Sequence, residues 1–428
     1  MLDEQQRNRV FNIIIITQCL GMVVPALFQN GFFLNYFTKL GISSAAIAML
    51  FALSPLSSIF LLLPFAFYSD RFGKRQLALV GQILLVASLG LMMLAGWGFD
   101  TRTALLLVVM SLVVSSVGGS LQAAGWFALL NPIVPKEIRG RFFGRLRVSF
   151  QLAAILFTLL ITRMLKVSEA MTTFQLLLGI VFLATLLRYF TYARIPELEN
   201  AGGEENHRDP FQKALAKVLA EPGYLHFNSY VFLFTLFTSA VPIVFGLMQK
   251  DAFEFTPAQI TRVGTLFLTG SMLGCWVGGR AVDRYGSRMV FVIAHLAFAA
   301  SMFALLARHW VPWSLFAHVG GCSLAFSLVG GMAGVAITTE TLALIPAANK
   351  SLSTAFTMTL SNASIALAGM GVSRVIGWSI LSPGWQMLGQ KYTAYDSLVL
   401  FFAAMMLLML VAIGLVPSIT PKSSIAEK

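Results

Sequence analysis

The chain has 428 residues, of which 57% are apolar and only 11% are charged, and its mean hydropathy is +0.79. Because a soluble domain is about 25% charged, this composition excludes a soluble protein and predicts one that crosses a membrane many times. The formal net charge of +12 comes from basic residues spread over short loops between apolar runs, which argues against a nucleic-acid-binding patch.

Apolar segments long enough to cross a bilayer follow one another along the chain. A spanning helix needs about 20 mostly apolar residues. We therefore predict an all-α membrane protein with twelve transmembrane helices, at 10–37, 45–68, 75–97, 103–130, 142–165, 170–193, 225–250, 257–281, 287–308, 312–343, 349–380 and 393–417. The first run is too long for a cleavable signal, so we expect it to remain as a span. The three cysteines lie inside spans without metal-ligand or disulfide spacing, and we expect no metal and no cofactor.

A short polar motif recurs at equivalent places in two halves of the sequence. The loop after the second span reads Asp70-Arg71-Phe72-Gly73, and Asp283-Arg284-Tyr285-Gly286 lies 213 residues later. Helix-start residues recur at the same distance, since Thr256 begins a capping box before Pro257 and Ser43 is its counterpart. We therefore predict two pseudo-symmetric six-helix halves, 1–193 and 225–428. Parallel repeats usually bind substrate between the halves, near the bilayer midplane.

The linker between the halves, 194–224, is the longest loop and the only stretch of soluble character. Asp209 is placed to cap a short helix that begins at Pro210, and Phe211, Leu215 and Leu219 would share one face of that helix. We expect an amphipathic helix on the inner membrane surface. A disordered linker is the alternative.

Basic residues concentrate on one side of the predicted topology. With the N-terminus inside, 21 of the 30 Lys and Arg residues fall on the cytoplasmic side, a count that assigns Arg188 to the inner end of the sixth span. Because short cytoplasmic loops carry an excess of Lys and Arg, we expect both termini to be cytoplasmic and the membrane to be the cell (inner) membrane.

The recurring motif resembles the signature loop of the Major Facilitator Superfamily of secondary transporters, Gly-x-x-x-Asp-Arg-x-Gly-Arg/Lys-Arg/Lys. Residues of the first copy that match are Asp70, Arg71, Gly73, Lys74 and Arg75, with Ala66 in place of the first glycine. Residues of the second copy that match are Gly279, Asp283, Arg284, Gly286 and Arg288, with Ser287 at a position that is usually basic. The loop from Pro135 to Gly140, which contains Arg139, is similar to the inner loop between helices 4 and 5 of that family. The resemblance covers essentially the whole chain.

The Asp70 loop is a candidate gate. Asp70 follows the C-terminal end of a helix, where its charge opposes the helix dipole, so it should seek the N-terminus of the eleventh span near Asn349, or an arginine. The resemblance implies that such contacts between the halves stabilise an outward-facing state. The alternative is that the loop only fixes topology, because Arg71, Lys74 and Arg75 hold it at the anionic inner leaflet.

Polar side chains form helical stripes within several spans. A polar group without a partner is costly in lipid, so these stripes should face the bundle interior or a wet cavity. The candidate cavity residues are Gln18, Gln29, Gln122, Trp126, Gln151, Thr235, Ser239, Ser361 and Asn362. Small serines and threonines could equally serve close helix packing, whereas the larger glutamines favour a cavity.

Carboxylates are scarce within the spans, and Glu340 is the one that lies well inside. A membrane-embedded carboxylate is a candidate for carrying a proton or closing a gate. A structural salt bridge to Arg284, Arg288 or Lys350 is the alternative. The full set of coupling or gating candidates is Glu340, Asp70, Arg71, Gly73, Arg75, Asp283, Arg284 and Arg139.

These features predict a secondary transporter that moves a small organic solute by alternating access, with protons as the candidate coupling ion. No catalytic motif is present, and we expect no enzyme activity. One alternative is an exporter of amphipathic or drug-like compounds, since aromatic and Met-rich walls tolerate varied shapes. Another is a transporter-like receptor or assembly factor without flux. The expected partners are the lipid bilayer and a small-molecule substrate, with no nucleic acid, and we expect a monomer.

Overall fold

The computed structural model describes residues 4–130, 133–134, 139–198, 213, 216, 219–220, 222–344, 350–382 and 384–415. Within these ranges, the side chains of 4, 66–72, 125, 127–128, 139–141, 143–144, 222, 342–343, 350–352, 354 and 412–415 are outside the description. Two expectations therefore lie beyond the described residues: the helix predicted to start at Pro210, and the partner of the Asp70 carboxylate.

The N-terminal half begins with a first span that is broken twice. Its helices are α1 (Glu4–Gly21), α2 (Val23–Gln29) and α3 (Phe32–Lys39), followed by α4 (Ser44–Phe72), α5 (Lys74–Leu94), α6 (Thr101–Leu130), α7 (Arg139–Val167) and α8 (Met171–Ala193). Gly31 separates α2 from α3 with a φ of 78°, a left-handed conformation that favours glycine.

The C-terminal half begins with an unbroken span. It contains α10 (Pro222–Asp251), α11 (Pro257–Leu306), the 3-10 helix η2 (Ala307–Trp310), α12 (Leu315–Leu344), α13 (Lys350–Gly377) and α14 (Ala394–Leu415). The described residues contain eleven candidate membrane spans, and the one from Pro257 to Trp310 is 54 residues long. Because a non-helical residue, Gly286, divides that segment into two helices, the twelve-helix fold expected from the sequence is confirmed.

The glycines of the two motif copies adopt the same kind of conformation. Gly73 has a φ of 89° between α4 and α5, and Gly286 has a φ of 77° within α11. Both positions therefore need a residue that tolerates a positive φ. The predicted capping box at Thr256 is also confirmed, since Gln259 N donates to Thr256 Oγ1 at 3.3 Å and Thr256 N donates to Gln259 Oε1 at 2.8 Å.

A short hairpin that the sequence did not reveal joins α13 to α14. Strands β1 (Gly384–Met387) and β2 (Gln390–Thr393) pair antiparallel, with Gly384 opposite Thr393. The turn residues Leu388 and Gly389 both have positive φ. Leu388 is an unusual residue for such a turn, which normally uses Asn-Gly or Asp-Gly, so no hairpin signal is visible in the sequence.

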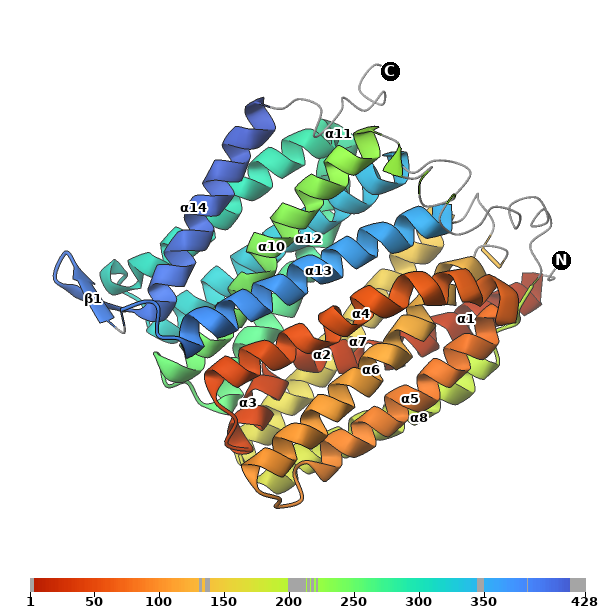
Figure 1. The fold of residues 1–428 in the computed structure, drawn as a ribbon, viewed down its shortest axis with the longest axis horizontal. Coiled ribbons are helices and arrows are strands. Elements are labelled where there is room, and N and C mark those ends of the chain that lie inside the picture. Colours follow the sequence, from red (N-terminus) through yellow and green to blue (C-terminus); the bar gives the residue numbers. More distant parts are fainter. Residues whose placement is uncertain are drawn as a thin grey trace.

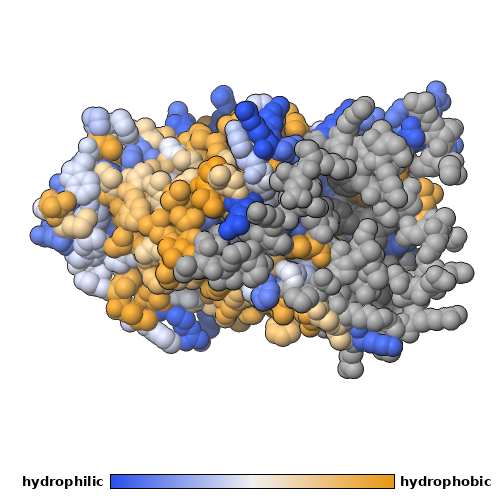
Figure 2. Space-filling model, turned by 90° about the horizontal axis from the view of Figure 1, so that it is seen from above, coloured by the Kyte–Doolittle hydropathy of each residue, from blue (hydrophilic) through white to orange (hydrophobic). Residues whose placement is uncertain are grey.

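The helices run side by side between two ends of a single bundle, with the first half (red to yellow) beside the second half (green to blue) in Figure 1. We call the end that carries β1 and β2 the hairpin end. The opposite end carries the start of α1, Gly73 and Gly286, and we call it the Gly73 end. Hydrophobic residues cover much of the described surface in Figure 2, as a lipid-facing belt requires.

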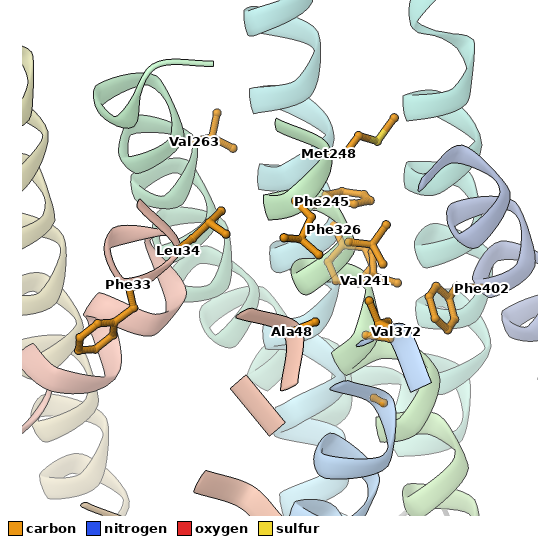
Figure 3. Packing of buried hydrophobic residues seen from close by; sticks show 14 of the residues in the cluster. Phe33, Leu34, Ala48, Val241, Phe245, Met248, Val263, Phe326, Val372 and Phe402 are labelled. Carbon is orange, nitrogen blue, oxygen red and sulfur yellow. The ribbon is translucent and has the colours of Figure 1, made fainter. Parts of the chain in front are cut away.

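The largest hydrophobic cluster contains residues from both halves. Figure 3 shows Leu34 of α3 beside Val263 of α11, and Phe245 of α10 beside Phe326 of α12. A second cluster, near the Gly73 end, is formed by residues of the N-terminal half, among them Leu130, Phe142 and Tyr192. The described core therefore joins the halves most extensively toward the hairpin end.

Candidate functional site

A cavity with a volume of about 790 Å³ lies between the two halves. Its wall is built from α1, α2, α3, α4, α5, α6 and α8 of the N-terminal half and from α10, α11, α12 and α13 of the C-terminal half. The volume is within the range of about 300–1,000 Å³ that is usual for small-molecule sites. The cavity is the candidate site for a solute.

Four of the residues proposed from the sequence line this cavity. They are Gln18, Gln29, Gln122 and Ser239. Gln18 and Gln29 come from α1 and α2, on either side of the first break in that span. At the second break, Asn30 Oδ1 accepts from Phe32 N at 2.9 Å and Asn30 Nδ2 donates to Thr158 Oγ1 at 3.2 Å.

The other cavity candidates lie elsewhere in the bundle. Trp126 packs against Tyr192, with their ring centres 5.8 Å apart. Gln151 of α7 reaches the other half, because its Nε2 donates to the Leu268 carbonyl at 3.4 Å. Ser361 donates to the Thr357 carbonyl of its own helix at 3.0 Å. Thr235 and Asn362 are half-buried on α10 and α13, outside the set of residues that line the cavity.

Arg188 is a cavity residue that the sequence analysis did not propose. The charge count took it as a basic residue at the inner end of the predicted span 170–193; it lies within the span Met171–Ala193, is 9% exposed and lines the cavity. A positional signal exists, since Thr185, Arg188 and Tyr192 follow a spacing of three and four that puts them on one face of a helix. All three are buried.

The guanidinium of Arg188 is held by neutral groups. Its Nε donates to the Thr17 carbonyl at 3.2 Å, and its Nη1 donates to Gln122 Oε1 at 3.0 Å. Gly21 makes room for it, because a Cβ atom there would lie 2.4 Å from Arg188 Cζ. Among the side chains that the structure describes, no carboxylate pairs with Arg188, and its Nη2 donates to no protein atom.

The C-terminal half contributes neutral polar atoms without partners to the same cavity. Ser239 Oγ, Gln249 Oε1 and Ser323 Oγ are enclosed and make no hydrogen bond to the described protein atoms. Buried polar atoms are normally satisfied, so unpaired ones at a cavity wall indicate a place where solvent or a ligand completes the bonding. Gln122 Nε2 is another such atom, on the N-terminal half.

The cavity is closed toward the hairpin end by contacts between the halves. Asn35 Nδ2 donates to the Pro257 carbonyl at 3.3 Å, and Thr162 Oγ1 donates to Thr261 Oγ1 at 3.2 Å. Backbones also approach closely at Gly264, where a Cβ atom would lie 2.3 Å from Asn30 Cα.

A polar cluster adds to this closure at the surface. Ser44 Oγ of α4 donates to Asp251 Oδ2 at 2.7 Å and accepts from Lys250 Nζ at 2.7 Å, while Tyr395 OH also donates to Asp251. Lys250 and Asp251 form an ion pair of 3.0 Å. We call Ser44, Lys250, Asp251 and Tyr395 the latch.

The gating candidates lie near the Gly73 end. Glu340 is 4% exposed, and its nearest polar neighbour in the described structure is the Ser287 side chain. Asp283 and Arg284 are exposed, and Arg284 lies over the ring of Tyr285. The side chains of Asp70, Arg71 and Arg139 are outside the described set.

Glu197 holds the start of α5 beside the first motif copy. Its carboxylate accepts from Lys74 N at 2.7 Å and from Arg75 N at 3.3 Å. A carboxylate at a helix N-terminus is favourable, because it satisfies free amide groups and complements the helix dipole. The chain segment after α8 is thereby tied to the Gly73 loop, a contact that the sequence analysis missed.

Comparisons with known proteins agree with this architecture. The family profile of the Major Facilitator Superfamily matches residues 10–369. Among solved structures, the nucleoside transporter NupG is 14% identical with a TM-score of 0.67 and covers 96% of this chain and 98% of its own. A partially occluded inward-open form of the xylose transporter XylE from E. coli is 14% identical with a TM-score of 0.67, covering 95% and 98%. The human organic anion transporter MFSD10 is 13% identical with a TM-score of 0.64, covering 95% and 99%. No match was found among curated protein sequences.

Proposed function

The chain belongs to the Major Facilitator Superfamily and is a multi-pass membrane transporter of that family, and we propose that it moves a small organic solute by alternating access through the central cavity. The observation that carries the proposal is the cavity itself, which is bounded by both halves and lined by unpaired polar atoms. Solved structures below 25% identity support the fold alone, so their substrates are not transferred to this chain.

Four glutamine and serine residues are proposed to contact the solute: Gln18, Gln29, Gln122 and Ser239. Trp126, Gln151, Thr235, Ser361 and Asn362 are proposed to act indirectly, through helix packing around the cavity. The test is counterflow of a panel of labelled solutes in proteoliposomes. Saturable exchange of at least one solute supports transport, and a solute that binds without exchange favours a receptor or assembly factor.

Orientation is proposed from the distribution of basic residues. Both termini face the cytoplasm of a cell (inner) membrane, so the state described here, with its hairpin end closed, is an inward-facing one. A reporter fused after Lys428 should be cytoplasmic, and one inserted near Asp100 should be on the other side. A C-terminal reporter that is active only outside would contradict this topology.

Glu340 is proposed as the coupling group for protons. If it carries the proton, Glu340→Gln should abolish accumulation driven by a pH gradient but leave solute exchange, because exchange need not move a net proton. If Glu340 instead forms a structural ion pair, the variant leaves a basic partner unpaired, and folding yield and exchange should fall together. Full pH-driven accumulation in the variant would remove Glu340 from the mechanism.

Export of amphipathic compounds is the second candidate function. It is favoured by the apolar part of the wall, which includes Met22, Phe28, Phe51 and Phe267. Flexible methionine and broad aromatic surfaces accept varied shapes. Competition of hydrophobic cations with the exchanged solute would support this function over a dedicated solute carrier.

A further inference from the structure

The cavity contains a buried positive charge whose negative partner is missing from the described protein. Arg188 is held by the Thr17 carbonyl and the Gln122 side chain, and both of these groups are neutral. A buried charge that is compensated only by neutral hydrogen bonds is unfavourable, so such residues are normally paired. In a membrane-spanning segment, an unpaired ionisable residue facing a cavity indicates a functional site.

The geometry leaves part of the guanidinium available to a ligand. Its Nε and Nη1 are occupied on the α1 and α6 sides, and the group lies against Gly21. Nη2 donates to no described protein atom. It is also not enclosed by protein atoms, so it is accessible from the cavity. A guanidinium is the side chain best suited to bind a carboxylate, through strong charge-assisted hydrogen bonds.

We propose that Arg188 binds the carboxylate of the solute, and that the substrates are small organic monoanions. This assignment of a substrate class rests on the transport function proposed above. One unpaired positive charge calls for one negative charge. The enclosed Gln122 Nε2, which also lacks an acceptor, lies beside the guanidinium and would gain one from the same anion after a small side-chain rotation.

The opposite wall defines the rest of the ligand. Ser239, Gln249 and Ser323 of the C-terminal half provide neutral polar atoms without partners, with no added charge. A solute with hydroxyl, amide or ring nitrogen groups away from its carboxylate would satisfy both walls, which a simple fatty acid or a dianion would not. A ligand that bridges the two halves is also what alternating access requires.

The experiment measures binding by calorimetry to the purified full-length protein in nanodiscs. The probes are three acids and their uncharged amides: mandelate and mandelamide, nicotinate and nicotinamide, gluconate and gluconamide. For the wild type we expect at least one acid to bind tenfold or more tightly than its amide. Arg188→Gln should weaken the binding of that acid tenfold or more and leave the binding of its amide unchanged. Arg188→Lys should retain part of the affinity for the acid. Arg102→Gln, which removes an exposed positive charge at the hairpin end, is the matched control and should bind as wild type does.

The outcomes separate a ligand-binding role from a structural one. If Arg188→Gln elutes as a folded protein and its affinities for the acid and the amide fall equally, Arg188 is structural and the proposal is wrong. If that variant does not fold, the wild type and Arg188→Lys are compared instead. The proposal is overturned if, in these proteins, no acid binds or the acids bind no more tightly than their amides. If an acid binds through Arg188 but shows no counterflow, the result supports the carboxylate site and contradicts the proposed transport function.

Discussion

The hairpin end and the Gly73 end of the bundle are held together in different ways. At the hairpin end, described contacts of several kinds join the halves: close backbone packing at Gly264, hydrogen bonds such as Asn35 to Pro257, and the latch. Near the Gly73 end, comparable described contacts lie within one half, as when Glu197 binds the amides of Lys74 and Arg75, or when Tyr224 OH donates to the Ser353 carbonyl at 2.6 Å. A transporter must be able to exchange these two arrangements, so each end should contain contacts specific to one state.

The comparison also separates permanent contacts from those that must break. The buried pair of Arg308 and Asp396 at the hairpin end lies entirely within the C-terminal half, so it can persist in every state. The latch and Gly264 lie between the halves and must separate when the hairpin end opens. Substitutions in the first group should therefore change stability, and those in the second should change the population of states.

The largest effect is expected from Asp396→Asn. Arg308 Nη1 and Nη2 donate to the Asp396 carboxylate at 2.5 and 3.0 Å, and the two side chains are 5% and 0% exposed. Removing the charge leaves a buried guanidinium unpaired, which costs about 3–5 kcal/mol. The apparent melting temperature of the purified variant should fall by many degrees, with Glu169→Gln, a partly exposed carboxylate at the same end, as the control. An unchanged melting temperature would show that the pair adds nothing.

Next in size is Gly264→Ala, which should prevent closure of the hairpin end. The new Cβ would meet Asn30 Cα at 2.3 Å and its carbonyl atoms at 2.6 Å, and Asn30 is itself fixed by Thr158. Alanine favours the helix by about 1 kcal/mol over glycine, so folding should not suffer. We expect a longer spin-label distance between Ser168 and Lys391 and at least a tenfold loss of exchange.

Gly321→Ala is the matched control for that substitution. It adds the same methyl group to α12, a neighbouring helix of the same half, at a position where no atom lies within 4 Å of the new Cβ. Normal exchange in the control together with lost exchange in Gly264→Ala would assign the effect to the contact between the halves. Normal exchange in both would mean that the close approach is not required.

The features that could be predicted from the sequence are those that depend on residues close together in the chain. Gly73 and Gly286 each need a positive φ, and Thr256 with Gln259 satisfies its own helix start, so their roles depend on nearby residues. Arg188 was not proposed as a cavity residue because a basic residue close to the inner end of a span is what the positive-inside rule predicts. Its true environment comes from Thr17 and Gln122, which are far away in the sequence.

Glutamines show the same limit. Gln18, Gln122 and Gln151 all carry a polar group on an otherwise apolar helix, and periodicity alone does not distinguish them. Gln151 reaches a backbone carbonyl of the other half, whereas Gln18 and Gln122 line the cavity. The difference depends on which helix faces each side chain, and that is set by tertiary packing.

A smaller effect is expected from Asp251→Asn in the latch. Asparagine keeps an acceptor for Ser44 and Tyr395 but removes the ion pair with Lys250. Because both charged groups are partly exposed, the pair contributes only about 0.2–1 kcal/mol. The population with an open hairpin end should rise by a few-fold at most, measured with the same pair of labels. High salt should produce a similar shift in the wild type and little further change in the variant, since salt screens the pair.

The smallest effect, and one of opposite sign, is expected from Asp70→Asn at the Gly73 end. Asp70 is proposed to join the halves when the hairpin end is open, so removing its charge destabilises that state. In the conditions that favour the state described here, the hairpin end is already closed, and a population near its limit can shift only slightly. The label distance between Ser168 and Lys391 should therefore shorten little in Asp70→Asn alone. In the Gly264→Ala background, where the open state dominates, the same change should have a larger effect, while expression stays near normal. If Asp70→Asn changes no distance in either background, the loop only fixes topology, and the two ends of the bundle do not act as opposing gates.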